Sequence, residues 1–288
     1  APSPYCTWWA GRSNATGCLA IPGVDCDDDG HVVRLDLTTA GLRGTLPDSL
    51  GELVGLKTLV LANNELAGSL PSLAALVDLD TLDLSNNQLT GSLPGCELAK
   101  LSAVSASKND FDAFPDCYFS DLPDLQTLAL SDNPRLGVDV AALDVAAATN
   151  LARLSLANAS VTGSPAALAS GSLADLDLSH NALAGALDLD AFLAGLPRLS
   201  RLDLGHNALS GAPPTSRGAP ALKRVDLSAN AFSGALSYDA LYALVGDPTV
   251  AEIHAELFID DNVFCGSLDE GLEPFASLSE GFLATGNR

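Results

Sequence analysis

A six-residue pattern, L-x-L-x-x-N or a close variant, recurs along the chain and constrains its fold more than any other feature. Eight copies end in asparagine, at Asn64, Asn87, Asn109, Asn133, Asn181, Asn207, Asn230 and Asn262. Two further copies carry alanine in that position, at Ala40 and Ala159. Successive copies lie 22 to 32 residues apart. A unit of that size cannot cover its own apolar side chains, so neighbouring units have to stack.

Each unit predicts one short strand, because the two leucines of L-x-L point inward and the residue between them points outward. The period is that of leucine-rich repeats. We therefore predict an α/β-type solenoid of about ten repeats over residues 32–268, with a parallel β-sheet on its concave face. The asparagine follows where the chain turns inward, and its amide is expected to bond backbone groups that the turn buries. We expect such a ladder at Asn64, Asn87, Asn109 and Asn133.

A second motif follows several of these asparagines, as LRGTLP at 42–47, LAGSLP at 66–71 and LTGSLP at 89–94, with altered copies farther on. Glycine permits backbone conformations that other residues avoid, and proline stops a strand from extending. This motif resembles that of plant-type extracellular leucine-rich repeats, and the resemblance covers essentially the whole chain. The resemblance implies a second short strand in each unit, a right-handed superhelix, and short 3-10 or helical segments on the convex face. The long gap before Asn262 predicts one short helix, around Leu241 and Leu244.

Both ends of the chain resemble the caps of such proteins. Residues 1–31 contain YCTWW and GVDC, which resemble the plant N-terminal cap and imply a bridge between Cys6 and Cys26. Cys18 complicates this pairing, because three cysteines leave one unpaired or exchange the bridge. Residues 269–288 form a C-terminal cap or tail, and NVFCGSL resembles its beginning. The later cysteine of that cap is missing, so Cys265 is either free or separated from its partner.

A second disulfide is predicted from spacing alone. Cys96 and Cys117 lie nine and eight residues after Asn87 and Asn109, so adjacent coils should place them side by side. Neighbouring coils stand about 5 Å apart, which is within disulfide reach.

Charge and cysteine usage restrict the partners and the compartment. The net charge of −22 disfavours nucleic acid and acidic lipid surfaces, and a basic or metal-ion partner fits better. No run of eighteen apolar residues occurs, so we expect no membrane insertion by this chain. The start, APSPYC, reads as a mature or trimmed chain. The cysteines and the glycosylation sequons at Asn14 and Asn158 favour an extracellular or cell-surface protein.

The outward-pointing strand residues predict a charged strip in the C-terminal half of the concave face. Its residues are Arg153, Asp175, Asp177, His180, Arg201, Asp203, His206, Arg224 and Asp226. One interpretation is a ligand-binding strip, since solenoids usually bind on this face. The other is a self-neutralising ladder whose exposed ion pairs are each worth roughly 0 to 1 kcal/mol. The two are about even for the strip as a whole.

The other chemical motifs have simpler explanations. Residues 25–36, DCDDDGHVVRLD, match the spacing of a calcium-binding EF-hand loop, but their end is predicted to be a strand and flanking helices are absent. We expect no metal and no cofactor, and we interpret His180 and His206 as exposed ladder residues. The small series Thr58, Thr81, Ala103 and Thr127 suits close strands, or, as a weaker alternative, an ordered lattice such as ice or a polysaccharide. No catalytic motif is present, so we do not expect an enzyme.

The middle of the chain narrows the resemblance. Residues 109–165, which include FDAFP, SDNPRLG and LANASVTGS, resemble the ectodomains of the plant transmembrane-kinase group of receptor-like kinases. The resemblance implies a recognition module for a protein, peptide or carbohydrate ligand, with a co-receptor or a second copy as a further partner. The repeats resemble polygalacturonase-inhibiting proteins more distantly, which leaves a secreted inhibitor of cell-wall-degrading hydrolases open. A structural component of a cell wall or surface coat is the third alternative.

Overall fold

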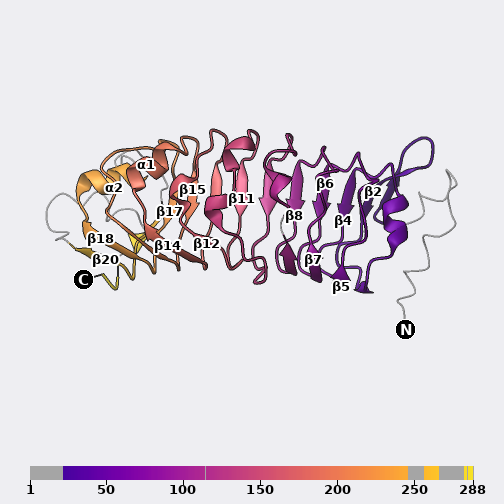
Figure 1. Ribbon diagram of the computed structural model, residues 1–288, viewed down its shortest axis with the longest axis horizontal. Coiled ribbons are helices and arrows are strands. Elements are labelled where there is room, and N and C mark those ends of the chain that lie inside the picture. Colours follow the sequence, from indigo (N-terminus) through magenta and orange to yellow (C-terminus); the bar gives the residue numbers. More distant parts are fainter. Residues whose placement is uncertain (1–21, 114, 246–255, 266–281, 284, 288) are drawn as a thin grey trace. The chain divides into compact units, whose positions relative to one another are not determined.

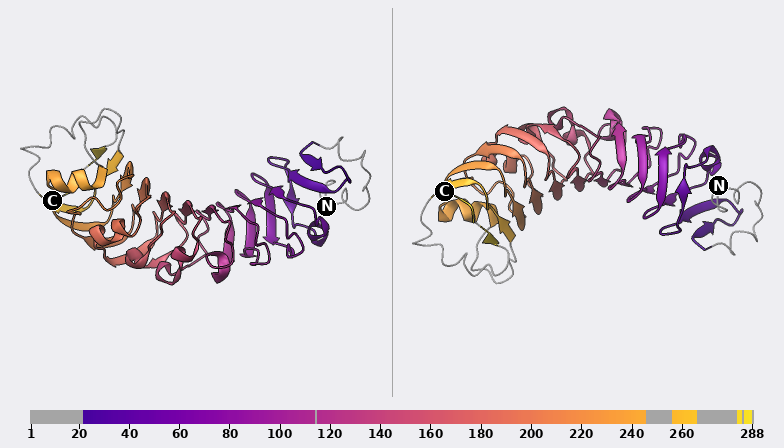
Figure 2. Two further views of the ribbon diagram at one scale, coloured as in Figure 1. Left: turned by 90° about the horizontal axis from the view of Figure 1, so that it is seen from above. Right: turned by 90° about the horizontal axis from the view of Figure 1, so that it is seen from below.

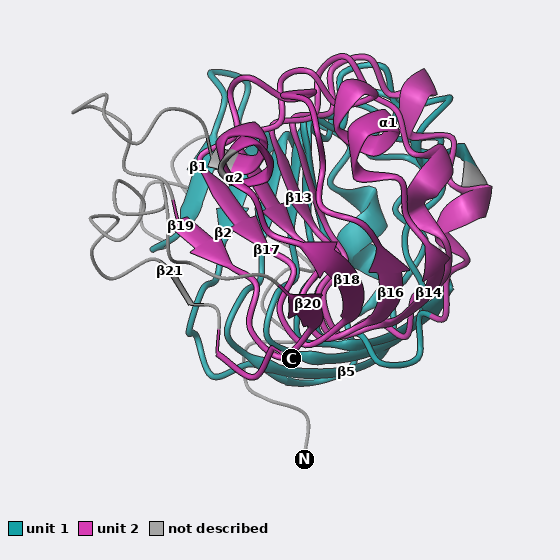
Figure 3. Ribbon diagram, turned by 90° about the vertical axis from the view of Figure 1, so that its left-hand side faces the viewer, with its two compact units in different colours: residues 1–136 teal, residues 137–288 magenta. Residues whose placement is uncertain are grey.

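The computed structural model describes residues 22–113, 115–245, 256–265, 282–283 and 285–287 (Figure 1). The chain divides into two units, Ala1–Leu136 and Gly137–Arg288, coloured separately in Figure 3. Within each unit the chain winds in successive coils, and each coil contributes one short strand to a long sheet. This is the leucine-rich-repeat solenoid that the L-x-L-x-x-N period predicts.

The long sheet is parallel except at its first strand. In the first unit its strands are β1 (Val24–Cys26), β2 (Val32–Asp36), β4 (Thr58–Val60), β6 (Thr81–Asp83), β8 (Ala103–Ser105) and β10 (Thr127–Ala129). In the second unit they are β11 (Arg153–Ser155), β13 (Asp175–Asp177), β15 (Arg201–Asp203), β17 (Arg224–Asp226), β19 (Glu256–Phe258) and β21 (Phe282–Leu283). Only β1 runs antiparallel to its neighbour among these described strands. Equivalent residues pair across the coils, as Leu59 does with Leu82.

The L-x-G-x-L segments form a second set of short parallel strands, as the plant-type motif predicts. They are β3 (Arg43–Gly44), β5 (Glu65–Ser69), β7 (Gln88–Ser92) and β9 (Asp110–Ala113) in the first unit. The second unit has β12 (Thr162–Gly163), β14 (Ala182–Ala186), β16 (Ala208–Gly211), β18 (Ala231–Ala235) and β20 (Val263–Cys265). Gly68 and Gly91 have φ angles of 80° and 78°, which explains the glycine of the motif. The strands continue after Asn181, where the motif has lost its proline.

Short helical segments connect the two sets of strands (Figure 2). They comprise the 3-10 helices η2 (Asp48–Glu52), η3 (Asp116–Tyr118), η4 (Val140–Ala142), η5 (Val145–Ala147) and η6 (Pro165–Ala167), and the α-helices α1 (Leu189–Ala194) and α2 (Tyr238–Val245). Helix α2 is the one predicted in the long gap, and its Leu241 and Leu244 are buried. In the described part of the chain, no helix combines the length and hydrophobicity that crossing a bilayer requires.

Buried leucines fill the interior of each unit, and buried or half-buried asparagines hold adjacent coils together. The Asn109 side chain donates to the carbonyl of Ala106 in its own coil at 3.1 Å and of Leu84 in the preceding coil at 3.0 Å. Its Oδ1 atom accepts the backbone N–H of Leu89 at 3.0 Å. Each bond satisfies a backbone group that lacks water. The predicted ladder is confirmed at Asn64, Asn87, Asn109 and Asn133, and the same contacts recur at Asn181, Asn207, Asn230 and Asn262.

The ladder extends beyond the ten units recognised in the sequence. Strand β21 pairs in parallel with β19. Asn287 accepts the N–H of Phe264 at 3.2 Å and donates to the carbonyl of Ile259 at 3.0 Å. Residues 282–287 therefore repeat the strand and its asparagine within the segment expected to be a cap or tail.

The structure contains the bridge between Cys96 and Cys117, whose Cα atoms lie 6.1 Å apart on adjacent coils. Cys26 is also disulfide-bonded, while its predicted partner Cys6 and the competing Cys18 lie outside the described residues. Cys265, at the end of β20, is free and exposed.

Removing one ladder amide should destabilise the protein strongly. We expect Asn109→Ala to lower the free energy of unfolding by on the order of 3 kcal/mol, because buried carbonyls and a buried N–H lose their partners. Gln88→Ala, an exposed change on β7, is the matched control and should cost little. Urea unfolding followed by circular dichroism measures both. Equal midpoints for the two variants would contradict a structural role for the ladder.

Removing the internal disulfide should also lower stability. The bridge closes a separation of 21 residues, so the double variant Cys96→Ser/Cys117→Ser should lose about 3 kcal/mol, through the greater entropy of its unfolded chain. Cys265→Ser should leave the unfolding midpoint unchanged, because that thiol is already free. A double variant as stable as the wild type would show that the bridge is energetically neutral.

Candidate recognition surface

The predicted strip lies on the outward side of the long sheet in the second unit. The middle residue of each strand is buried, as Leu176 and Leu202 are, so its two neighbours face away from the core. The strand register aligns these neighbours into two rows. The first, called the arginine row, consists of Arg153, Asp175, Arg201, Arg224 and Glu256. The second, called the aspartate row, consists of Ser155, Asp177, Asp203, Asp226 and Phe258.

The arginine row pairs its three arginines with two acidic residues of the same row. Arg153 and Arg201 lie on either side of Asp175, with Nε atoms 3.4 and 3.9 Å from its two carboxylate oxygens. Arg224 pairs with Glu256 on the next strand, and its guanidinium carbon lies 4.9 Å from the centre of the Phe258 ring. For this row the ladder interpretation therefore holds. The repeat alignment on Asn262 also places Glu256 in this row, although the predicted strip did not include it.

The aspartate row has no such counter-charge. No arginine or lysine of the described residues forms an ion pair with Asp177, Asp203 or Asp226. Their local bonds are to the turn that follows each strand. Asp177 accepts the N–H and the hydroxyl of Ser179 at 3.1 and 2.8 Å, and Asp226 accepts the same groups of Ser228.

Asp203 differs from the two aspartates beside it. Glycine replaces the serine in its turn, so Asp203 accepts only the backbone N–H of Gly205, at 3.2 Å. Burial raises the pKa of Asp203, and the carboxylates of Asp177 and Asp226 raise it further, to about 6. The Gly205 N–H and the Arg201 charge oppose this increase without cancelling it. Burial first, and then the like charges of the row, disfavour the ionised form of Asp203.

The two histidines lie in the turns beside the aspartate row. His180 and His206 are exposed and both have a φ angle of 55°, and their rings stack with centroids 4.2 Å apart. The sequence had placed them on one edge of the strip without predicting this contact. Asn158, in the equivalent turn before them, is also exposed, and Asn14 lies outside the described residues. Glycosylation of either asparagine stays a prediction.

The calcium-like segment is arranged differently from an EF-hand loop. Strand β2 consists of Val32–Asp36, as expected. Asp36, at the end of this strand, accepts the hydroxyl of Thr38 at 2.7 Å. Asp27, Asp29 and His31 bring ligand atoms within 4.8 Å of one another, and all three are exposed. The N–H and the ring of His31 lower the pKa of Asp27. The absence of a metal from this loop stays a prediction.

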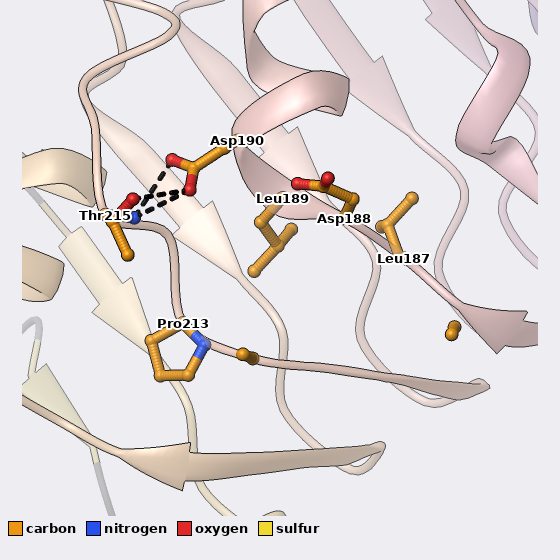
Figure 4. A pocket seen from close by; sticks show the side chains of 8 residues that line it. Leu187, Asp188, Leu189, Asp190, Pro213 and Thr215 are labelled. Atoms are coloured by element: carbon orange, nitrogen blue, oxygen red, sulfur yellow. Dashed lines mark hydrogen bonds between the residues drawn. The ribbon is translucent and has the colours of Figure 1, made fainter.

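One pocket of about 340 Å³ lies elsewhere in the second unit, between β14 and α1 (Figure 4). Leu187, Leu189 and Pro213 supply apolar walls. Asp190 faces Thr215 and accepts the N–H and the hydroxyl of both Thr215 and Ser216. These donors lower its pKa although burial acts in the opposite direction. The Asp190 carboxylate therefore fixes a loop, which sequence spacing alone does not reveal.

Family comparisons agree with the coil architecture. The family described as "Leucine Rich repeats (2 copies)" matches residues 54–99, and the family "Leucine rich repeat" matches residues 171–232. The receptor-like kinase TMK2 of Arabidopsis thaliana is 30% identical over 182 residues, which cover 60% of this chain and 18% of that protein. The receptor protein kinase WSS1 of Oryza sativa subsp. japonica is 50% identical over 54 residues, or 18% of this chain and 6% of that protein.

Solved structures share the same architecture. The plant peptide hormone receptor RGFR1, in complex with RGF2, has a TM-score of 0.67 and 26% identity, and the match covers 85% of this chain and 38% of that one. A plant ice-binding protein has a TM-score of 0.65 and 24% identity, covering 94% of this chain and 86% of that one. The second likeness concerns the fold alone.

The repeats, the two sets of strands and these matches show that the fold is a plant-type leucine-rich-repeat solenoid. At the level of sequence, its relatives are plant receptor-like kinases. The matches span 18% and 6% of the length of the two named above.

Neutralising Asp203 should stabilise the protein at neutral pH. Because its folded pKa is about 6 against 3.8 for the free group, ionised Asp203 costs stability above pH 6, and that cost disappears as the pH falls toward 3.8. Asp203→Asn keeps an acceptor for Gly205 and should add about 1 kcal/mol at pH 7.5, after allowance for solvent screening.

The gain should vanish near pH 4, and Asp112→Asn, an exposed change elsewhere, should show none at either pH. Urea unfolding at both pH values measures the difference. A loss of stability at pH 7.5 in Asp203→Asn would contradict the unrelieved charge of the row.

Proposed function

We propose that this chain is a non-catalytic extracellular recognition module that binds a protein or peptide through the outward sheet face of residues 137–288. The observation that carries the proposal is the contrast between the two rows. Arg153, Arg201 and Arg224 form ion pairs within the sheet, whereas Asp177, Asp203 and Asp226 form none among the described residues. A fixed array of unpaired charges on an exposed, ordered sheet is available to a partner.

The comparisons support the same kind of role. RGFR1 shares this fold and is a plant peptide hormone receptor, whose structure was solved in complex with RGF2. The sequence relatives are receptor kinases, of which this chain resembles the repeat region. We extend the proposal to an extracellular or cell-surface location, consistent with the disulfides at Cys26 and between Cys96 and Cys117. A co-receptor is a further candidate partner, whereas no observation favours a carbohydrate ligand.

An inhibitor of secreted hydrolases is the second candidate, because the aspartate row would equally suit a basic enzyme. The two candidates use the same face and differ in the partner. A measured complex with a cell-wall-degrading hydrolase, lost on substitution of Asp177, Asp203 and Asp226, would favour the inhibitor.

A glycan placed on the sheet face tests whether that face binds partners. Asp177→Asn creates the sequon Asn-Leu-Ser, so a secretory host can attach a glycan in the middle of the surface. Peptides selected on the wild-type protein from a displayed random nine-residue library should lose binding to this glycosylated variant by tenfold or more. Gln88→Asn creates Asn-Leu-Thr on β7 and provides the matched glycosylated control, which should bind normally.

Mass spectrometry verifies both glycans. Enzymatic hydrolysis of the glycan–asparagine bond leaves aspartate, so removal of the glycan at position 177 regenerates the wild-type residue and should restore binding. Selected peptides that bind all the glycosylated forms equally would contradict the assignment of this face.

A further inference from the structure

The aspartate row presents a regular spacing to anything that lies on the sheet. Neighbouring strands stand about 4.8 Å apart, so the outer carboxylates of Asp177 and Asp226 are separated by about 10 Å, with Asp203 between them. Charged or titratable side chains on the adjoining strands and turns surround this row. Asp175 and Arg201 lie on β13 and β15, Arg224 and Glu256 on β17 and β19, and His180 and His206 in the turns.

These neighbours leave the negative charges of the aspartate row without an ion-pair partner. The cations of the arginine row are held by Asp175 and Glu256. One oxygen of each of Asp177, Asp203 and Asp226 is bonded to the following turn, and no described residue donates to the second. Positive groups placed between adjacent strands would meet two carboxylates at once.

An extended peptide crossing the strands provides positive groups at a suitable interval. Its alternate side chains lie on one side and repeat every 6.6 to 6.8 Å, at about 3.3 to 3.4 Å per residue. Lysine and arginine side chains are long enough to place their charged groups in the two gaps between Asp177, Asp203 and Asp226, although the spacing of these gaps differs from that interval. Their apolar stems can cover the neighbouring Phe258 ring and the stacked imidazoles of His180 and His206.

We propose that the outward face of β13, β15 and β17 docks an extended cationic peptide, whose basic side chains at positions i and i+2 lie between Asp177, Asp203 and Asp226. This assignment rests on the proposed function and adds the chemistry of the ligand. Asp203 is the specificity-determining residue, because it is the carboxylate that both gaps share.

The docking of a cation is coupled to the ionisation of Asp203. A cationic side chain favours the ionised form, so binding below the pKa of about 6 requires release of a proton. If the ionised form alone binds, affinity at pH 5 should be about tenfold weaker than at pH 7.5. The Asp203→Asn variant has no such proton to release and should lose this part of the pH dependence.

The decisive experiment uses the peptides enriched from the random nine-residue library and proteins made in a host without N-glycosylation. We expect enriched sequences to carry lysine or arginine at i and i+2. Fluorescence anisotropy should show a loss of at least tenfold for Asp177→Asn/Asp203→Asn/Asp226→Asn, in which the replacing amides keep acceptors for the following turns. The control Asp112→Asn/Asp124→Asn/Asp144→Asn changes the net charge equally at exposed sites and should change affinity less than twofold.

Each other outcome has a definite meaning. Face-dependent peptides without basic residues would overturn the cationic ligand and leave the proposed function standing. Equal losses in the two triple variants would show attraction to the net charge of −22 alone and overturn the inference. If none of the selected peptides is blocked by the glycan at position 177, the proposed function is overturned as well. The same affinity at pH 5 and 7.5 for the wild type would overturn the role of Asp203.

Discussion

The bonding of buried asparagine side chains to the backbones of two successive coils is the constraint on which the structure depends. A coil that ends its strand and turns inward buries polar backbone groups, and a side-chain amide such as that of Asn109 satisfies a donor and two acceptors at once. Because those groups belong to two coils, the ladder fixes the position of each coil on its neighbour. The leucines then supply the apolar contact that stabilises the stack.

Fixed register is what converts a repeating sequence into a functional surface. Once Leu176, Leu202 and Val225 are aligned in the core, the residues after them must also align, so three aspartates become neighbours. The same geometry gives the preceding residues their ion pairs. A row of mixed charges and a row of like charges therefore arise side by side from one alignment, and the row of like charges is the one that we propose another molecule contacts.

The fold could be predicted because the sequence motifs that determine it are periodic. The features that the sequence did not predict lie where the repeat pattern is altered. The strands, the asparagine ladder and the Cys96 bridge follow from repeat spacing. Asn287 was missed because phenylalanine and alanine occupy the leucine positions before it. The strip residues were identified, but sequence alone could not decide which charges pair. That depends on side-chain reach across strands, as the contacts of Asp175 and of Asp190 illustrate.

The most direct test of this account is an NMR titration of the aspartate carboxyl groups in the intact protein. It reports how far burial and the neighbouring carboxylates of Asp177 and Asp226 together raise the pKa of Asp203. The account predicts a midpoint near pH 6 for Asp203. A midpoint near 3.8, the value of an isolated aspartate, would contradict it.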